Sequence, residues 1–244
     1  MKGSYVLCDE FEDGLSSESC EVRRYYAGRM DFTPNAEQIE RGLSDEDVEV
    51  RTLWGRRTDW SPSIEQVYRA LKDEEYIVRF VWSQRYDYAP SSDMAEIGLT
   101  DADYDVRMMW AARTDYTPTP KQIERGLTGV LGGMRRRWAE RMDWTPTYND
   151  IHRGVTDPHV AIRAAWAERG LYKPDKSIVD IGIRDPNMNV RWIWAQRDDY
   201  EPCTDQVWIG CNDSDDVTAR EWMDKLRRMN ESVLLCEDDT CHSI

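Results

Sequence analysis

The chain has 244 residues, and its 47 Asp and Glu side chains outnumber 32 Lys and Arg side chains, which gives a formal net charge of −15. A surface this acidic disfavours nucleic acids and anionic membranes as direct ligands, because both are themselves densely negative. We therefore expect the partner to be another protein with a basic surface, with no direct binding to nucleic acid or membrane.

Residues 1–20 form an atypical N-terminal segment ahead of the regular part of the sequence. Residues 1–19 are polar and acidic, which predicts that no signal peptide opens the chain. No apolar run approaches the roughly 20 residues that a membrane-spanning helix needs. The six cysteines lie at irregular positions, four of them near the C-terminal end, as expected of reduced thiols. These features predict a cytoplasmic protein, in the host cytoplasm if the chain is viral.

From residue 21 onward the sequence repeats itself in the pattern V-R-x-x-W-x-x-R-x-D-aromatic-x-P, and the residue number rises by 28 from each copy to the next. A fixed period of this length is typical of a repeat array, in which each copy buries its apolar surface against its neighbours. The aromatic anchors of successive copies are Tyr26, Trp54, Trp82, Trp110, Trp138, Trp166, Trp194 and Trp222.

Each copy is predicted to contain two short helices, as the second copy illustrates. Asp47 begins a stretch whose apolar residues, from Val50 to Trp54, follow helical spacing, which predicts a first helix, named helix A. After a turn, Ser61 and Pro62 are expected as N-cap and first residue of a second helix, helix B. The small residue near the end of helix B is glycine in most copies, which indicates close helix packing or an early helix end.

The loops between copies carry a resemblance to known repeat families. Aspartate stands shortly before arginine, as in Asp45 and Arg51, and the stretches D-x-D-x-x-V-R and D-P-x-x-x-I-R resemble the loop and helix start of HEAT-like repeats. The stretch R-x-D-Y-T-P resembles the N-P-x-T-P segment of the leucine-rich repeat variant. The resemblance covers roughly residues 21–226, and it departs in the tryptophan, where those families have a small aliphatic residue, and in a longer turn between the helices.

The resemblance implies a right-handed superhelix with a concave binding face, and it implies no single function. We therefore expect an all-α fold, an α-solenoid of about seven two-helix, HEAT-like repeats that form one superhelical body.

One copy breaks the pattern, because residues 128–134 contain three glycines in place of the acidic loop. Glycines weaken a helix start and favour a bend, although drift in one loop explains the same residues. We therefore predict an N-terminal repeat lobe at 21–127, a C-terminal repeat lobe at 128–223 and a polar capping tail at 224–244.

The recurring Asp and Arg residues are expected to form a ladder between consecutive loops, and the tryptophans to fill the space between helices A and B. A second aromatic series lies in the turn after helix A. Its rings either pack across repeats or, if exposed, bind a partner. The turn aromatics that we predict as partner-binding residues are Trp60, Tyr88, Tyr116, Trp144 and Tyr200.

Acidic residues occupy the outward positions of helix B, and further acids lie in the loops. If layers advance by about 8–10 Å and each repeat presents three carboxylates, one edge carries a charge every ~3 Å, within a factor of two of duplex DNA. This density allows mimicry of a nucleic acid; an acidic surface that only confers solubility is the alternative. The predicted acidic, partner-binding face consists of Glu37, Glu40, Glu65, Asp93, Glu96, Glu124, Asp180 and Asp205.

The sequence contains no recognisable catalytic motif. Phosphate-binding loops, nucleophile elbows and the H-E-x-x-H motif are missing. None of the three histidines lies at a spacing from a carboxylate or a cysteine that would suggest an acid/base pair. Cys236, Cys241 and His242, with Cys203 and Cys211, include enough ligands for zinc but lack the C-x2-C spacing of a reliable site. We therefore predict no catalytic residues, no metal and no cofactor.

The functional hypothesis that follows is a non-catalytic, protein-binding α-solenoid. It would act as an inhibitor or adaptor that docks on a basic surface of a nucleic-acid-processing complex, in the manner of phage-encoded antagonists of host defence. One alternative is a scaffold or assembly factor that binds its partner through the turn aromatics. A HEAT-like DNA glycosylase is a further alternative, although this chain lacks the basic groove that such an enzyme uses.

Overall fold

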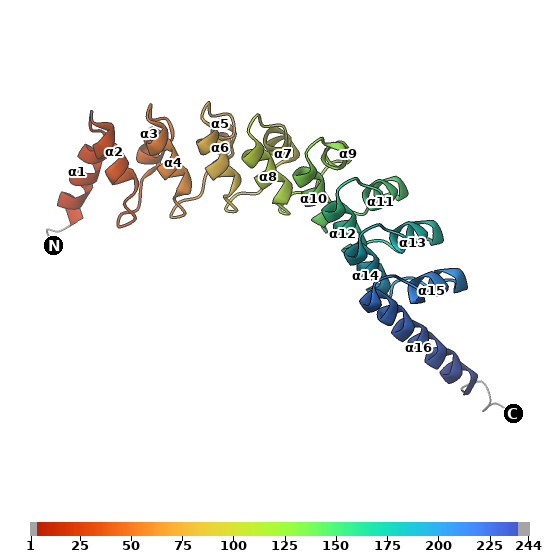
Figure 1. Ribbon diagram of the computed structural model, residues 1–244. Helices are drawn as coiled ribbons and strands as arrows, with labels where there is room; N and C mark the ends of the chain where they lie inside the picture. The colour runs from red at the N-terminus through yellow and green to blue at the C-terminus, as the bar shows by residue number, and fades with distance from the viewer. Residues whose placement is uncertain (1–3, 239–244) are drawn as a thin grey trace. The chain divides into compact units, whose positions relative to one another are not determined.

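The computed structural model describes residues 4–238 of the chain and the side chains of residues 10–229. Within this range it contains sixteen α-helices and no strand, and the chain is an α-solenoid of two-helix repeats (Figure 1). The helices A are α2 (Cys20–Ala27), α4 (Val48–Arg56), α6 (Tyr76–Ser83), α8 (Tyr104–Ala112), α10 (Gly132–Glu140), α12 (Val160–Glu168), α14 (Met188–Gln196) and α16 (Asp216–Asp238). The helices B are α1 (Ser4–Leu15), α3 (Ala36–Leu43), α5 (Ile64–Ala70), α7 (Ser92–Leu99), α9 (Pro120–Thr128), α11 (Tyr148–Val155), α13 (Lys176–Gly182) and α15 (Thr204–Cys211).

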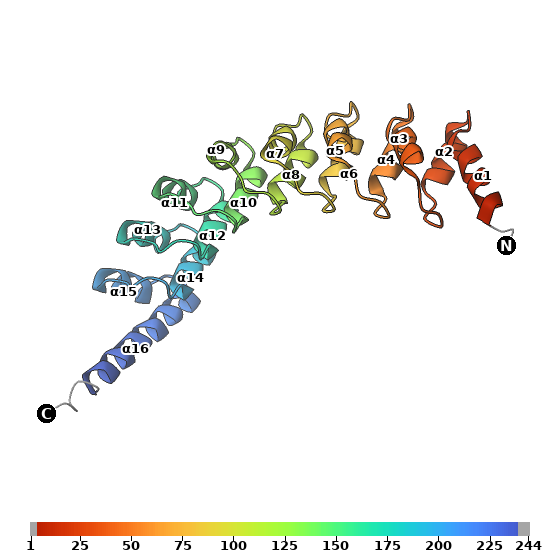
Figure 2. The same ribbon diagram turned by 180° about the vertical axis from the view of Figure 1, so that it is seen from behind.

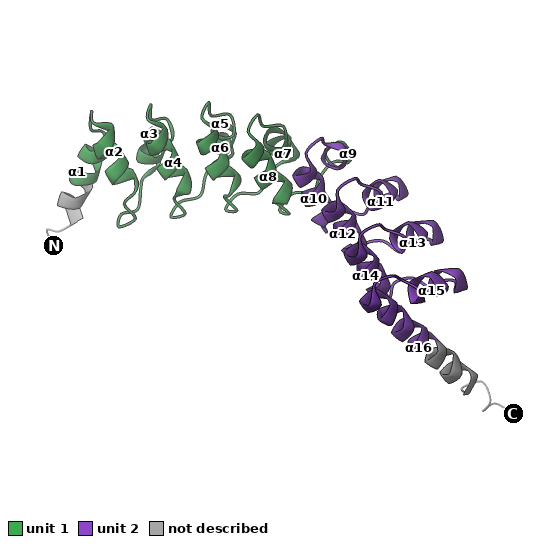
Figure 3. Cartoon of the chain, viewed as in Figure 1, with its two compact units in different colours: residues 1–122 green, residues 123–244 purple. Residues whose placement is uncertain are grey.

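The first residues of the helices A, from Cys20 to Asp216, are evenly spaced along the chain, so the sequence period is also the structural period. The chain divides into two compact units, residues 1–122 and residues 123–244 (Figure 3). Within the first unit α2, α4, α6 and α8 pack side by side, and within the second α10, α12, α14 and α16 do the same. The helices B form the other layer of each unit, which the view from behind also shows (Figure 2).

Helix B begins at a different residue from the predicted one. In α5 the N-cap is Ser63, not Ser61, and helical residues start at Ile64, two positions after Pro62. The Ser63 side chain accepts a hydrogen bond from the Gln66 backbone N–H, and the Gln66 side chain accepts one from the Ser63 N–H. This reciprocal capping box satisfies two backbone donors and outweighs the preference of proline for the first helical position.

Helix packing in most repeats depends on a glycine of helix B that lies against the tryptophan of the following helix A, and α5 has Ala70 at this position. The tryptophans from Trp54 to Trp222 in this series are at most 1% exposed. A Cβ atom added at Gly98 would lie 2.1 Å from the Trp110 indole, and one at Gly154 would lie 2.2 Å from the Trp166 indole. The glycine is therefore needed for close helix packing, which was one of the two predicted explanations.

The N-terminal segment contains a helix that extends the array. In α1, Gly14 packs against the Tyr26 ring as the later glycines pack against tryptophan, and Glu12 binds Arg41 of α3 at 2.5 Å. Helix α1 therefore occupies the place of helix B in a further copy, so eight helical pairs are present in the described residues.

At the other end, α16 runs without interruption from Asp216 to Asp238, through the predicted start of the capping tail at residue 224. The division at residues 122 and 123 falls inside α9, slightly ahead of the predicted lobe boundary after residue 127.

Candidate protein-binding surface

Most loop carboxylates are used to join consecutive repeats. Each of six helix A arginines forms a two-pronged ion pair with an aspartate of the next loop between repeats, at 2.6–2.8 Å for the closest contact. The same guanidinium donates to two backbone carbonyls of its own loop, as Arg51 does to Asp45 and Glu46. Charge-assisted, bidentate pairs of this kind fix orientation as well as adding binding energy. The pairs are Arg23–Asp45, Arg51–Asp73, Arg79–Asp101, Arg135–Asp157, Arg163–Asp185 and Arg191–Asp213.

The turn aromatics are enclosed by the protein itself. Tyr116, Trp144 and Tyr200 are only 6–8% exposed, while Trp60 and Tyr88 are half-buried. The hydroxyls of the three tyrosines donate to the backbone of the preceding helix A, as Tyr116 does to the Trp110 carbonyl at 3.2 Å.

Several of these rings also stack on a buried cation of the next repeat. The Arg85 guanidinium lies 4.6 Å from the Trp60 ring centre, and the Arg169 guanidinium lies 4.4 Å from that of Trp144. Packing across repeats, the alternative that the sequence left open, therefore accounts for this series. Tyr116, Trp144 and Tyr200 leave little ring surface for a partner, and the partner-binding role of the series stays a prediction.

The eight acidic residues predicted on helix B fall into two rows with different surroundings. In the first row, each side chain binds the following repeat. Glu40 accepts from Arg69 at 2.8 Å and from Gln66, and these hydrogen bonds lower its pKa. Glu124 accepts from Arg153 at 2.9 Å. The other two members, Glu96 and Asp180, accept from the side-chain amides of Gln122 and Gln206.

This paired row therefore consists of Glu40, Glu96, Glu124 and Asp180. Its charges hold neighbouring helices B together, so these carboxylates are already engaged within the protein.

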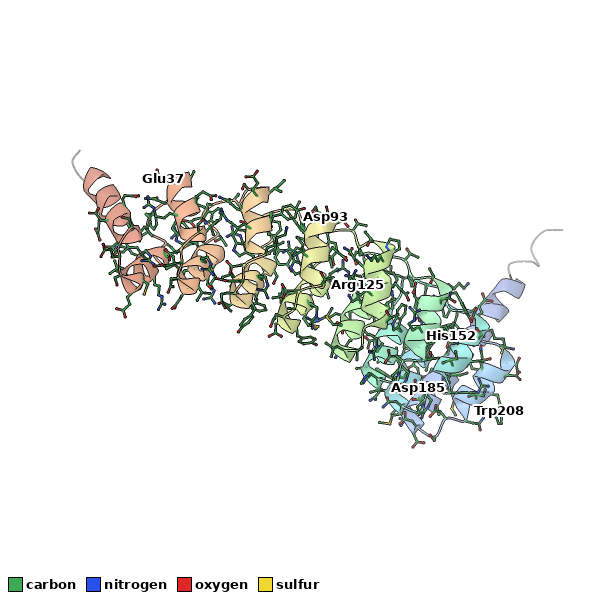
Figure 4. All side chains as sticks on the ribbon, turned by 90° about the horizontal axis from the view of Figure 1, so that it is seen from above. Glu37, Asp93, Arg125, His152, Asp185 and Trp208 are labelled. Carbon is green, nitrogen blue, oxygen red and sulfur yellow. The ribbon has the colours of Figure 1, made fainter. Side chains whose placement is uncertain are left out.

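The second row lies in the first turn of helix B and faces solvent. Glu37, Glu65 and Asp93 occupy the same position in α3, α5 and α7, and all three are exposed; Figure 4 labels the first and the last. The Glu37 side chain is 85% exposed, and its contact with Arg41 is long at 3.7 Å. We call Glu37, Glu65 and Asp93 the exposed acidic row.

The exposed acidic row does not continue through every copy. Asp205 holds the same position in α15, but the intervening copies have Lys121, Asn149 and Ser177 there. Asp205 is therefore separated from the row by three repeats without a carboxylate at this position.

The acidic excess lies in two parts of the chain, and one of them carries this row. Residues 1–122 contain 25 Asp and Glu against 15 Lys and Arg, whereas residues 123–200 contain 11 against 13. The remaining acidic excess lies in residues 201–244, with 11 against 4. The acidic surface is therefore not uniform along the repeats.

Pairing also reduces the density of free charge below the predicted value. The exposed helix B carboxylates are separated by one layer of the solenoid, about 8–10 Å, whereas duplex DNA carries one phosphate charge per roughly 1.7 Å of its axis. The density of free charge is therefore several times lower than that of DNA. Glu46 and Glu74 add one exposed loop carboxylate in each of two copies, with side chains 87% and 84% exposed, although Glu46 also accepts from Arg23 at 3.1 Å. Such separated charges suit individual Lys or Arg side chains better than a continuous polyanion-binding channel.

Candidate catalytic and metal-binding groups are sparse in the described residues. Among the described side chains, those of residues 10–229, no cluster of three or more His, Cys, Asp and Glu side chains is placed to hold a metal ion. His152 and His159 are exposed, while His242 and Cys241 of the weak zinc pattern lie outside the described residues. In that same range no helix combines the length and the apolar character that crossing a membrane requires.

No protein-family model matches this chain, and no curated protein matches it. Among solved structures it is similar to "a leucine-rich repeat variant with a novel repetitive protein structural motif". The two are 22% identical, the alignment covers 84% of this chain and 76% of that one, and the TM-score is 0.56. The likeness shows the fold, and it confirms the predicted resemblance to a short-helix repeat solenoid.

Proposed function

We propose that this chain is a non-catalytic protein-binding solenoid that docks on a Lys- and Arg-rich surface of another protein through its exposed acidic row. The observation that carries the proposal is the repetition of one exposed carboxylate at one position of three successive helices B, within a part of the chain that has a net acidic excess. The partner class that fits is a nucleic-acid-processing complex, because its nucleic-acid-binding surface is basic. The chain would act on it as an inhibitor or adaptor.

The separation of the charges defines the kind of contact. Each carboxylate of the row accepts hydrogen bonds from one Lys or Arg side chain of the partner, and the repeat spacing sets the distance between these contacts. Exposed ion pairs contribute about 0.2–1 kcal/mol each, so three contribute about 0.6–3 kcal/mol. Charge complementarity of this kind raises the association rate and selects the partner, while apolar contacts around it supply further affinity.

A purely structural explanation of the row is also available and can be separated from binding. Acidic residues in the first turn of a helix interact favourably with the helix dipole, typically by about 0.3–1 kcal/mol each. Glu21, Glu49 and Asp105 also lie in the first turn of their helices, the helices A of the same unit. They provide a control set with the same residue types at the same position of the helix, and Glu49 differs only in its ion pair with Arg24 at 3.0 Å.

The test compares two triple variants. Glu37→Lys, Glu65→Lys and Asp93→Lys together reverse the exposed acidic row, and Glu21→Lys, Glu49→Lys and Asp105→Lys reverse the control set. The partner is first captured from a lysate of the source cells at low salt and identified by mass spectrometry, and its affinity for both variants is then measured. The row variant is expected to bind at least about 10- to 100-fold more weakly, given three lost ion pairs.

Salt provides a second readout. The Debye length falls from about 10 Å at 0.1 M salt to about 3 Å at 1 M, so binding through exposed charges weakens steeply over this range. Equal loss of affinity in both triple variants would point to net charge alone, and a salt-insensitive complex would contradict the proposal.

A further inference from the structure

The last repeat replaces the buried arginine of the turn with a lysine. Lys225 holds the place that Arg197 has one repeat earlier, it is 4% exposed, and its ammonium nitrogen lies 4.2 Å from the centre of the Tyr200 ring. The amine donates to the backbone carbonyls of Ala195 and Arg197. Arg197 has a carboxylate partner two positions later, Asp199, whereas the corresponding residue after Lys225 is Arg227. Lys225 is thus a buried amine held mainly by two carbonyls.

An open hollow of about 240 Å³ lies beside this amine, where α16 continues as a helix. Its walls carry both signs of charge. The residues that line it are Asp198, Tyr200, Glu201, Pro202, Lys225, Arg228 and Met229.

Burial, assisted by the nearby charge of Arg228, lowers the pKa of Lys225 to about 8 against the opposing effects of Asp198, Asp199 and Glu221. A substantial fraction of the amine is therefore neutral in mildly alkaline solution. A neutral amine keeps two N–H donors, which match the two carbonyl acceptors, and gains a free lone pair. A lone pair on a buried lysine is what makes such residues nucleophiles.

We propose that Lys225 reversibly takes up carbon dioxide as a carbamate and that Arg228 binds the carboxylate formed. The lysine nitrogen forms a bond to the carbon of carbon dioxide, one C–O π pair moves onto oxygen, and the nitrogen releases a proton to solvent. The balance is R–NH₂ + CO₂ → R–NH–COO⁻ + H⁺, which requires no oxidant or reductant.

Carbon dioxide suits this site better than larger electrophiles. It is small and uncharged, so it reaches an amine that is almost fully enclosed and passes the carboxylates of Asp198 and Glu201. Arg228 is available to bind the product, because its contacts with Asp198 and Glu221, at 3.8 and 3.6 Å, are longer than hydrogen bonds. A guanidinium matches a planar carboxylate geometrically.

The test is chemical trapping of the carbamate on the full chain. The protein is incubated with ¹³C-labelled carbon dioxide and bicarbonate at about pH 8, near the pKa of this amine, carbamates are alkylated to stable esters, and peptides are mapped by mass spectrometry. The ester is expected on Lys225 in severalfold higher yield than on the exposed lysines Lys72, Lys121, Lys173 and Lys176. At constant dissolved carbon dioxide, the yield on Lys225 should rise between about pH 7 and pH 9.

Two variants complete the experiment. Lys225→Arg restores the residue of the other repeats, so it should fold. A ¹³C NMR spectrum of the wild type under labelled carbon dioxide should show a carbamate resonance that Lys225→Arg loses and the control Lys173→Arg keeps. Arg228→Gln leaves the amine in place and should lower the yield severalfold. Labelling of Lys225 no stronger than that of the exposed lysines, or a yield unchanged in Arg228→Gln, would overturn the proposal. No outcome depends on the protein-binding function.

Discussion

Replacing Gly98 with alanine probes the close contact between helix B and the following tryptophan, which a glycine makes in all the regular repeats except the one with Ala70. The new Cβ atom would lie 2.1 Å from the Trp110 indole, whereas carbon atoms pack best at about 3.5–4.0 Å. Relief of this overlap requires α7 to move away by more than about 1 Å, or the indole to leave the place where it is now fully buried.

The expected cost follows from two opposing effects. Overpacking in a tight core costs about 1–3 kcal/mol, and partial displacement of a buried tryptophan adds to it, since complete loss costs about 3–5 kcal/mol. Alanine recovers up to about 1 kcal/mol through its better helix propensity. We expect Gly98→Ala to destabilise the chain by about 3 kcal/mol, which lowers the melting temperature by about 6–12 °C.

Thermal and denaturant unfolding, followed by circular dichroism, measure this loss. Gly28→Ala is the matched control, because the nearest atom to its added Cβ would lie at 3.6 Å and its backbone is right-handed helical. Trp110→Leu, combined with Gly98→Ala, should recover part of the lost stability, because the smaller side chain leaves space for the new Cβ atom. The effects of the two substitutions on the free energy of unfolding should therefore be non-additive. A Gly98→Ala chain as stable as Gly28→Ala would refute the close-packing argument.

The other predictions concern the ion pairs, the buried amine and the stacked rings. Asp73→Ala leaves the buried Arg51 without its carboxylate and should cost about 3–5 kcal/mol in urea unfolding, whereas Glu74→Ala, at an 84% exposed side chain, should change stability by less than about 0.5 kcal/mol. Because the pKa of Lys225 is lowered to about 8 on folding, the unfolded state binds more protons between about pH 8 and pH 10. The stability of the wild type should therefore rise by up to about 1.5 kcal/mol from about pH 8 to pH 9.5 relative to Lys225→Arg, and a flat difference would contradict the lowered pKa. Trp144→Ala should lower the melting temperature by several degrees, because the burial of the ring is lost. If Trp144→Ala instead keeps its melting temperature and loses partner binding, the turn aromatics bind the partner.

The repeat architecture could be predicted because its cause is local in the sequence. A strict period in the tryptophans, arginines and prolines determines which helix faces are buried, and the glycine of helix B already indicated close packing. Residues 11–15 also fit the period, since Phe11, Glu12, Gly14 and Leu15 hold the places that Ile39, Glu40, Gly42 and Leu43 have in the next copy. That signal, read directly, would have identified α1 as a further helix B.

The spacing of acidic residues on one helix could not show which of them are paired with a neighbouring repeat and which are exposed to solvent. Glu37 and Glu40 both fall on the predicted outward side of α3, yet Glu40 is bound by Arg69 of the next repeat and Glu37 faces water. The difference depends on the reach of an arginine on the neighbouring helix B, which requires the offset between adjacent helices. For the same reason, the sequence placed Trp60 correctly in a turn but did not show that Arg85 covers its ring.

The measurement that tests the central proposal most directly is the affinity of the captured partner for the two charge-reversal triples at low and at high salt. Reversal of Glu37, Glu65 and Asp93 should weaken binding by at least about 10- to 100-fold at low salt, while reversal of the first-turn acids of the helices A should leave it nearly unchanged. Both variants should melt at similar temperatures. Undiminished binding by the row variant, with the fold intact, would contradict the account.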